Sequence, residues 1–250
     1  MAEQLVVVGA GIIGLAVARQ ALESFPGLDV HIIEKPDENI PLPSKLNSGV
    51  IHSGIYYRPG SARALLCKRG NSSIKSLAGE LGVPVALSGK LIVAKFGEES
   101  ALKNLAETAH ANQVEIRELS GHDLKDIQPG IRNAAGGIFV KSTAYTDPNL
   151  LLERMRADLV ARGVVFHAAV IKSIEREKLA SKIATKIRPQ SPIINAAGIG
   201  SLQIAQESGL VKEFGLLPIV GRYLVYEGSK LDLRVPVYGV PHKKNVALGH

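Results

Sequence analysis

Three glycines near the amino end of the chain have a spacing that suits phosphate binding. They are Gly9, Gly11 and Gly14 of "GAGIIG", which fits the pattern G-x-G-x-x-G. In this pattern the first glycine permits a tight turn, the second lets the backbone approach a pyrophosphate, and the third lets helix and strand pack closely. Glu34 follows Gly14 after 34 − 14 = 20 residues, where an acid accepts hydrogen bonds from ribose hydroxyls. The spacing predicts a dinucleotide site rather than an ordinary turn.

The neighbours of these residues are expected to complete the site through the backbone. Ile12 and Ile13 open a helix whose free N–H groups and positive dipole end attract phosphate, and Lys35 follows the acid directly. Because Glu34 would repel an additional ribose phosphate, the pattern argues against NADP.

The elements that must position this site form a βαβ unit over residues 4–35. "QLVVVGAG" and "LDVHIIEK" predict buried strands, and "IGLAVARQALESF" predicts the helix between them. Strand and helix patterns alternate along the rest of the chain, which predicts an α/β protein. We expect a Rossmann-like dinucleotide-binding domain interleaved with a sheet-rich α+β substrate domain. The predicted boundaries are 1–82 and 150–212 for the first domain and 83–149 and 213–250 for the second.

Two further segments carry predictions about local structure. Ser61 is expected to cap a helix that ends at Gly82 and buries Leu66, among other apolar residues. "VVFHAAVIKSIERE", residues 164–177, and "SPIINAAG", residues 191–198, predict buried strands. Small residues at the end of the second strand are typical of a place where a ligand lies against the backbone.

Composition narrows the classes of protein. With 250 residues and 46% hydrophobic residues, the chain can form a sizeable core, and its single cysteine, Cys67, excludes an internal disulfide. The net charge of +7 invites a nucleic-acid interpretation, but the basic residues are spread along the chain. Only 4% of the residues are aromatic, which leaves no stacking platform, so we expect no nucleic-acid partner. The histidines lack metal-ligand spacing, and no metal is predicted.

Residues 46–67, "LNSGVIHSGIYYRPGSARALLC", form a loop that runs into a helix, and the loop is unusually rich in glycine and in polar side chains that can bind a ligand. Together with "SGKLIVA", "IINAAGIGSLQIA" and "PIVGRYLV", this loop resembles the FAD-dependent L-2-hydroxyglutarate oxidases and dehydrogenases, within the D-amino-acid-oxidase-like superfamily. The resemblance covers essentially the whole chain and implies FAD as the cofactor. It implies that FAD is contacted by the following residues: Asn47, Ser48 and Gly49 in the loop, Val170 at the adenine, and Ala197 with Gly198 at the dinucleotide.

Oxidation of a 2-hydroxy acid requires a hydride acceptor, a base for the hydroxyl proton and a cation for the carboxylate. His52 is the candidate base because imidazole titrates near neutrality, and His250 is its rival. A purely structural hydrogen-bonding role for His52 within the cofactor loop stays open. Arg222 is the candidate for the carboxylate because guanidinium binds carboxylate bidentately, although a solvated strand arginine is an equal alternative.

The resemblance thus predicts an enzyme that oxidises a small-molecule 2-hydroxy acid, L-2-hydroxyglutarate to 2-oxoglutarate, with oxygen or a quinone as electron acceptor. Two alternatives are a related FAD-dependent amino-acid oxidase or glycerol-3-phosphate dehydrogenase, and a truncated, non-catalytic dinucleotide-binding remnant. The second arises because the chain stops before the C-terminal part of the family fold, and because Leu46 stands where the family has a polar residue. The expected location is the cytoplasm, with peripheral association with the inner membrane as a further possibility.

Overall fold

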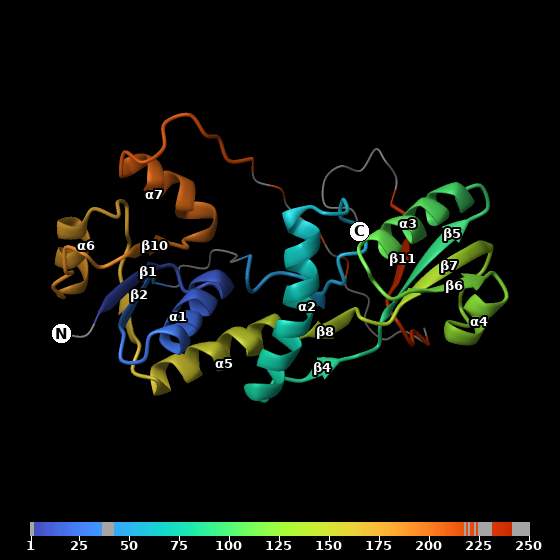
Figure 1. The fold of residues 1–250 in the computed structure, drawn as a ribbon, viewed down its shortest axis with the longest axis horizontal. Helices are drawn as coiled ribbons and strands as arrows, with labels where there is room; N and C mark the ends of the chain where they lie inside the picture. The colour runs from blue at the N-terminus through green and yellow to red at the C-terminus, as the bar shows by residue number, and fades with distance from the viewer. Residues whose placement is uncertain are drawn as a thin grey trace. The chain divides into compact units, whose positions relative to one another are not determined.

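A computed structural model describes residues 3–36, 43–217, 219, 221, 222, 224 and 232–241. The chain divides into two compact units, which are coloured by residue number in Figure 1. Each unit is built from two separate stretches of sequence. Unit 1 comprises Met1–Asn47 and Pro148–Pro218, and unit 2 comprises Ser48–Asp147 and Ile219–His250.

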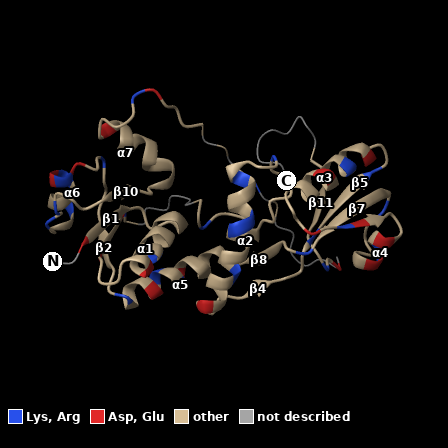
Figure 2. Cartoon of the chain, viewed as in Figure 1, with Lys and Arg blue, Asp and Glu red and all other residues tan. Residues whose placement is uncertain are grey.

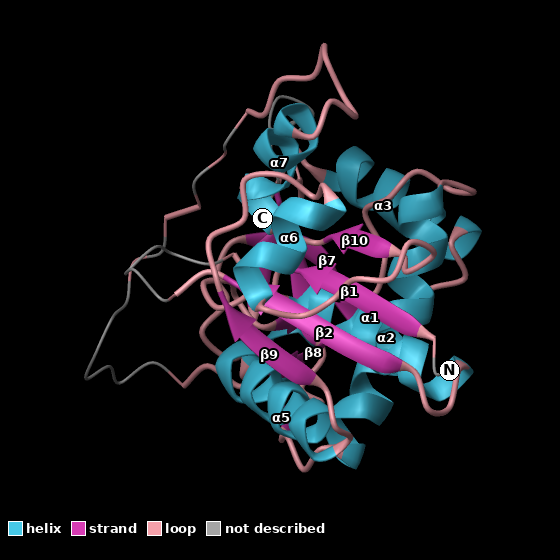
Figure 3. Cartoon of the chain, turned by 90° about the vertical axis from the view of Figure 1, so that its left-hand side faces the viewer, coloured by secondary structure: helices cyan, strands magenta, loops and turns pink. Residues whose placement is uncertain are grey.

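Unit 1 is built around a parallel four-stranded sheet of order β10-β1-β2-β9. Figure 3 shows these four strands side by side. The predicted βαβ unit is confirmed, since β1 and β2 flank helix α1 and pair in parallel. The strands are β1 (Gln4–Val8), β2 (Asp29–Glu34), β9 (Val165–Ala168) and β10 (Ile193–Asn195).

Helices lie on both faces of this sheet, which explains why every residue of β1 is buried. On one face, α1 (Ile12–Ser24) packs against β1 and against α5 (Pro148–Ala161). On the other face, α6 (Arg176–Ile183) and the short α7 (Ser201–Glu207) pack against the sheet. The cluster on this second face consists of Val6, Val8, Ile33, Leu179, Ile183, Ile187 and Ile204. A parallel sheet covered on both faces is the Rossmann-like architecture that the sequence predicts.

The strand predicted across residues 164–177 is wrong over its second half. β9 ends at Ala168 and α6 begins at Arg176. The reason lies in the spacing of the apolar residues: Leu179 and Ile183 are four positions apart and both are buried, as on one face of a helix. A salt bridge of 2.7 Å from Lys178 Nζ to Glu175 Oε1 also links the first turn to the residue before it.

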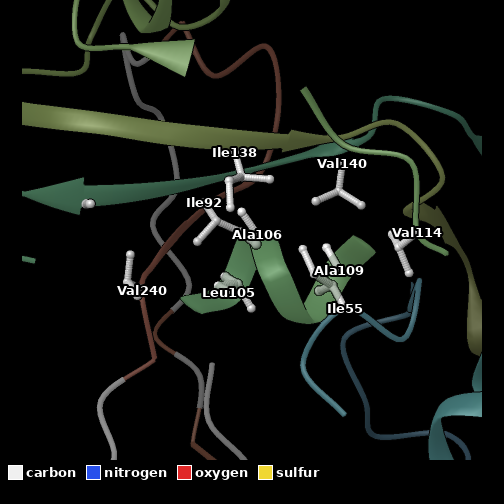
Figure 4. Packing of buried hydrophobic residues seen from close by; sticks show 10 residues of the cluster. Ile55, Ile92, Leu105, Ala106, Ala109, Val114, Ile138, Val140 and Val240 are labelled. Carbon is white, nitrogen blue, oxygen red and sulfur yellow. The ribbon is translucent and has the colours of Figure 1, made fainter. Parts of the chain in front are cut away.

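The described residues of unit 2 form two sheets. In the larger one, of order β11-β5-β7-β6, the first pair is parallel and the others are antiparallel. Its strands are β5 (Lys90–Lys95), β6 (Arg117–Ser120), β7 (Ala134–Val140) and β11 (Val237–Gly239). Helix α3 (Glu99–Ala111) covers one face, and Figure 4 shows its Leu105, Ala106 and Ala109 beneath Ile92 and Ile138. The short α4 (Asp123–Ile127) places Leu124 in a separate cluster with Leu91.

The smaller sheet of unit 2 corrects the predicted domain boundary. Its antiparallel strands, in spatial order, are β3 (Val50–Ile51), β8 (Ala144–Thr146) and β4 (Val85–Ala86). Residues 48–82, predicted to belong to the dinucleotide-binding domain, therefore lie in unit 2, because β3 pairs with β8. Helix α2 (Ala62–Glu80) follows β3 and stays in the same unit.

Surface charge in the described residues does not form a single basic stripe. Figure 2 shows Lys and Arg positions on both units, with Asp and Glu among them. None of the helices in the described ranges has the length and apolar character needed to cross a bilayer. Nor do three or more His, Cys, Asp or Glu side chains gather there in an arrangement that would hold a metal ion.

Candidate functional site

The glycine turn after β1 is shaped by contacts that exclude side chains. Gly9 has a φ of +109°, and a Cβ at this position would collide with the backbone carbonyl of Ala196. A Cβ on Gly14 would collide with the carbonyl oxygen of Gly9, so α1 lies directly on the turn. A Cβ on Gly11 would lie 3.1 Å from the Ser44 hydroxyl oxygen. Two of the glycines thus provide close backbone packing, as the sequence predicts, and the third faces the loop that carries Ser44.

The amino end of α1 offers donors to a ligand. Its N-cap residue, Gly11, has no side chain, and no acidic residue occupies the first turn. The Ile12 amide donates to Ser44 Oγ at 3.2 Å. The first amides of a helix have no partner within the helix and carry its positive dipole end. This end of α1 therefore suits a diphosphate, and Ser44 stands at its edge.

Glu34 occupies the end of β2, and its carboxylate is held by two backbone amides. Its Oε2 accepts from the Ala10 amide at 2.5 Å and its Oε1 from the Lys35 amide at 3.0 Å. An ionised carboxylate has about four acceptor positions, so two stay available for hydroxyl donors. The acid is thus fixed in place beside the glycine turn and is still able to accept hydrogen bonds from a ribose.

A cavity of about 390 Å³ lies over the carboxyl ends of β1, β2 and β10. Residues from the glycine turn, the end of β2, the segment after β9 and the segment after β10 line it together. Eight of the residues predicted to bind the cofactor line this one cavity: Gly9, Gly11, Ile13, Glu34, Lys35, Val170, Ala197 and Gly198. Ligands of open parallel sheets bind at this edge.

The remaining predicted cofactor residues lie elsewhere. Ile12 contributes its amide to the end of α1, and Gly14 is buried beneath the turn. The Asn47 side chain donates to the carbonyl oxygens of Pro43 and Ser44 at 3.3 and 3.0 Å, so it shapes the loop that carries Ser44. Ser48 and Gly49 belong to unit 2, where the Gly49 carbonyl accepts from the Thr146 amide at 3.0 Å.

Two lining residues of the cavity, Ser44 and Gln203, have no signal in the sequence pattern. Ser44 lies in an irregular, proline-bearing segment and Gln203 belongs to α7, whereas Ala196 is one of the small residues after β10 where a ligand was expected. They come together only because β10 pairs with β1, far away in the sequence. Branched apolar residues complete the wall: Val8, Ile33, Ile171, Ile199 and Ile204.

These features test whether the residues fit FAD, the cofactor that the sequence resemblance implies. Its adenosine part requires an apolar wall and a ribose acceptor, and its diphosphate requires backbone donors with no Cβ in the way. The cavity of unit 1 has all of these: the apolar wall, Glu34, the amides of α1 and the bare turn at Gly9 and Gly11. The residues therefore fit the adenosine diphosphate part of FAD.

A second cavity, of about 640 Å³, adjoins the first, since Gly11, Glu34, Lys35 and Ser44 line both. Its other walls come from α5 and β9, where the Arg156 guanidinium lies 4.0 Å from the centre of the Phe166 ring.

His167 of β9 also lines this second cavity, and its Nε2 lies 2.9 Å from Nδ1 of the buried His31. Burial and the neighbouring His31 lower the pKa of His167 below its ordinary value. His31 Nε2 in turn lies 3.1 Å from Asp29 Oδ1.

The candidate base, His52, lies in unit 2 between β3 and α2. Its carbonyl oxygen accepts from the Asn71 side-chain amide at 2.9 Å and from the Cys67 thiol at 3.5 Å. Asn71 is buried and also donates to the carbonyls of Ile51 and Ser142 at 3.3 and 2.9 Å. The backbone of the His52 loop is thus held from α2.

Arg222, another candidate catalytic residue, is not brought to a buried site. Arg222 is exposed and lies outside any helix or strand. His250 lies outside the described residues. Cys67 is half-buried, and burial raises the pKa of its thiol, while the positive charge of Lys90 lowers it in part. A raised thiol pKa is typical of an unreactive, packed cysteine.

Comparison with curated sequences finds relatives over most of the chain. It is 32% identical to the mitochondrial L-2-hydroxyglutarate dehydrogenase of Caenorhabditis elegans over 258 residues, 98% of this chain and 59% of that protein. It is 31% identical to the human mitochondrial enzyme of the same name over 98% of this chain and 57% of that protein. For the L-2-hydroxyglutarate dehydrogenase of Escherichia coli K12 the identity is 29%, over 87% of this chain and 53% of the relative. The chain thus spans little more than half the length of these relatives.

Solved structures share the fold. FAD-bound L-α-glycerophosphate oxidase from Mycoplasma pneumoniae superposes with a TM-score of 0.73 at 22% identity, over 96% of this chain and 66% of that one. Glycine oxidase from Geobacillus kaustophilus gives a TM-score of 0.70 at 15% identity, over 83% of this chain and 59% of that one. The family model named DAO, FAD dependent oxidoreductase, matches residues 4–249. With the glycine cradle and the acid of β2 in place, the chain belongs to this family of FAD dependent oxidoreductases.

Proposed function

We propose that the protein takes part in the FAD-dependent oxidation of a 2-hydroxy acid, L-2-hydroxyglutarate, to the 2-oxo acid. The observation that carries this proposal is the similarity to L-2-hydroxyglutarate dehydrogenases over 87% to 98% of the chain. The cavity of unit 1, which suits the cofactor of this family, supports it.

The residues of unit 1 bind and orient the cofactor. The amides of α1 and the bare turn at Gly9 and Gly11 receive the diphosphate, and Glu34 receives the ribose hydroxyls. Val170 and Ala197 border the same cavity from the other side. Bound FAD supplies the acceptor for the hydride that leaves the substrate α-carbon.

Removal of the hydride requires a base that takes the proton of the substrate hydroxyl group. We assign this role to His52, because a neutral imidazole accepts a proton near physiological pH. The hydrogen bonds from Asn71 and Cys67 to its carbonyl hold its backbone in position. The substrate carboxylates require a cation, and the exposed Arg222 is one candidate for that role.

The experiment is anaerobic flavin reduction. The purified full chain is mixed with FAD, freed of unbound cofactor, and titrated with L-2-hydroxyglutarate while the visible absorbance of oxidised flavin is followed. Bleaching by this compound, but not by D-2-hydroxyglutarate, glycine or glycerol 3-phosphate, would support the proposal. A FAD-saturated sample that L-2-hydroxyglutarate never bleaches would refute it, and bleaching by glycine or glycerol 3-phosphate alone would assign another substrate class.

We further propose that the electrons pass to oxygen or to a quinone. The reduced sample is mixed with air-saturated buffer or, separately and without air, with a soluble quinone. Recovery of the oxidised spectrum in only one of the two mixtures identifies the acceptor. Recovery in neither would refute this part of the proposal.

A further inference from the structure

Lys90, the first residue of β5, places a positive charge inside unit 2. Its side chain is 1% exposed, and among the described residues it is the largest of the fully buried side chains. In the described parts of the chain, no carboxylate forms a salt bridge with its ammonium group and no acceptor forms a hydrogen bond with it. Buried charges in proteins are nearly always paired, because transfer of an unpaired ion from water is expensive. Lys90 therefore has an unused capacity to bind an anion.

Aromatic rings surround this ammonium group. Its Nζ lies 4.2 Å from the centre of the Tyr56 ring and 5.3 Å from the centre of the Tyr238 ring. Tyr145 of β8 lies next to Tyr238, and its hydroxyl group is buried. The three tyrosines come from three different segments, namely the loop that carries His52, β8 and β11. We call these four residues the Lys90 cluster.

The tyrosines stabilise the ammonium only in part. Two cation–π contacts contribute favourably, but neither ring neutralises the charge. Burial accordingly lowers the pKa of Lys90 to about 8, while the neighbouring Cys67 acts in the opposite direction. An anion that approaches Lys90 stabilises the charged form of its amine, because opposite charges attract each other strongly where water is excluded.

The tyrosine hydroxyl groups add no negative charge to the same place. Burial raises the pKa of Tyr56 and of Tyr145 far above their ordinary value, so both phenols stay protonated near neutral pH. Tyr56, Tyr145 and Tyr238 are each half-buried, whereas Lys90 is fully buried. An anion that reaches this cluster thus meets a buried cation and phenols that carry no negative charge. The ammonium group of Lys90 can hold a carboxylate through charge-assisted hydrogen bonds.

We propose that the Lys90 cluster is an anion site that binds a carboxylate of the 2-hydroxy acid. The identity of the ligand rests on the proposed function, whereas the site itself rests on the geometry of unit 2. The cluster provides what the exposed Arg222 does not: a desolvated positive charge, whose attraction for an anion is stronger than in water. Tyr56 also follows His52 by four residues in the same loop, so one short segment contributes to the anion site and carries the proposed base.

The first test measures binding rather than turnover. Isothermal titration of the full chain, loaded with FAD, uses L-2-hydroxyglutarate and glutarate as carboxylate probes, with inorganic phosphate and glycerol 3-phosphate as the phosphate arm. Lys90→Met retains the length of the side chain and removes the charge. Its expected effect is a loss of carboxylate affinity of about tenfold to a hundredfold, the size expected for a charge-assisted hydrogen bond. Lys95→Met, at the exposed end of the same strand, is the matched control and leaves the affinity unchanged.

Stability separates a binding role from a structural one. Replacement of a buried, unpaired charge by an apolar side chain of similar volume leaves the unfolding temperature unchanged or raises it. If Lys90→Met lowers the unfolding temperature and binds carboxylates as the native protein does, Lys90 supports the fold and the inference is overturned. Tighter binding of phosphate than of glutarate by the native protein would also overturn the assignment of a carboxylate.

The pH profile gives a readout specific to an amine. The titratable groups that face Lys90 are Tyr56, Tyr238 and Cys67, and the raised pKa values of Tyr56 and Cys67 keep both neutral near pH 8. Since the pKa of Lys90 is about 8, carboxylate affinity falls as the pH rises through this value. Lys90→Arg stays charged and removes this fall. A profile that is the same in the native protein and in Lys90→Arg contradicts the proposal.

The outcomes also distinguish the anion site from the proposed function. Flavin reduction by L-2-hydroxyglutarate with an unchanged KM in Lys90→Met would retain the function and overturn the anion site. Loss of glutarate binding in Lys90→Met, with no flavin reduction by any 2-hydroxy acid in the native protein, would retain the anion site and refute the function. An increase in KM with a smaller change in kcat supports both.

Discussion

Replacement of Asn71 by alanine tests whether α2 holds the loop that contains His52. The Asn71 side-chain amide is buried and lies within 2.9 to 3.3 Å of the carbonyl oxygens of Ile51, His52 and Ser142. Its Oδ1 accepts from Lys75 Nζ at 2.8 Å. These contacts tie β3, α2 and the segment before β8 together, so one substitution loosens three parts of unit 2.

The size of the effect follows from the contacts that are lost. The amide group has two hydrogens, so the three carbonyl contacts amount to about two hydrogen bonds, each of about 1 kcal/mol net. The Ser142 carbonyl keeps its bond from Lys75 Nζ at 2.6 Å, and the His52 carbonyl keeps the Cys67 thiol, which limits the penalty for unsatisfied acceptors. We expect Asn71→Ala to lower the free energy of unfolding of unit 2 by about 2 kcal/mol, or its unfolding temperature by about 4 to 8 °C.

The assay combines thermal unfolding with amide hydrogen exchange. Exchange is expected to accelerate in residues 50–58 and to stay unchanged in β1 and α1 of unit 1, because Asn71 contacts only unit 2. Ser72→Ala is the matched control, since Ser72 is exposed on the same helix. A change of less than about 0.5 kcal/mol in Asn71→Ala, or equal acceleration in both units, would refute the reasoning.

Three further predictions concern unit 1 and α2. Gly14→Ala places a Cβ against the backbone and is expected to lower the FAD affinity about tenfold or more. The control is Gly70→Ala, which has open space around it and is expected to leave the FAD affinity unchanged. Quenching of flavin fluorescence measures both affinities. Because burial and His31 lower the pKa of His167, the folded state favours its neutral imidazole. The contribution of His167 to the free energy of unfolding is therefore complete above its ordinary pKa of 6.5 and falls as the pH drops below that value. His167→Gln is expected to flatten this fall in denaturant midpoints recorded from pH 8 to pH 5, and an unaltered slope would contradict it. Ser61→Ala removes the cap of α2 and is expected to cost about 1 kcal/mol of stability, which urea unfolding detects.

The βαβ unit of residues 4–35 can be predicted from the sequence because its signals are local. Buried strand patterns, three glycines and an acid at the expected spacing all act within one short segment, and the structure places them as expected. The cap of α2 is equally local: Ser61 Oγ accepts from the Ala64 amide at 3.2 Å. Residue type and spacing predict the structure where the interacting residues lie only a few positions apart.

The buried face of α2 shows why other predictions fail. Leu66 was expected to be buried but is 63% exposed, whereas Ala64, Asn71 and Ala78 are buried. Helix periodicity alone favours the larger apolar residue. Here small residues let the helix approach closely, and Asn71 is buried because distant carbonyls accept its hydrogen bonds.

The Lys90 cluster has no sequence signal for a similar reason. A lysine at the start of a strand normally indicates a solvated strand end, whereas the Lys90 ammonium group lies against Tyr56 and Tyr238 from remote segments. The boundary at residue 82 was wrong because pairing of β3 with β8 links positions about a hundred residues apart. Non-local pairings of this kind decide which unit a segment joins, and periodicity does not report them.

The order of the strands in unit 1 has a consequence for how the protein matures. β1 and β2 leave the ribosome first, but their outer neighbours, β10 and β9, are encoded more than a hundred residues later, after most of unit 2. Until then both edges of the nascent pair have unpaired backbone groups, which favour association with other chains. The walls contributed by Val170 and Ala197 are also missing at that stage. The nucleotide cavity is therefore complete only when synthesis has passed residue 204, and β11 of unit 2 is made later still.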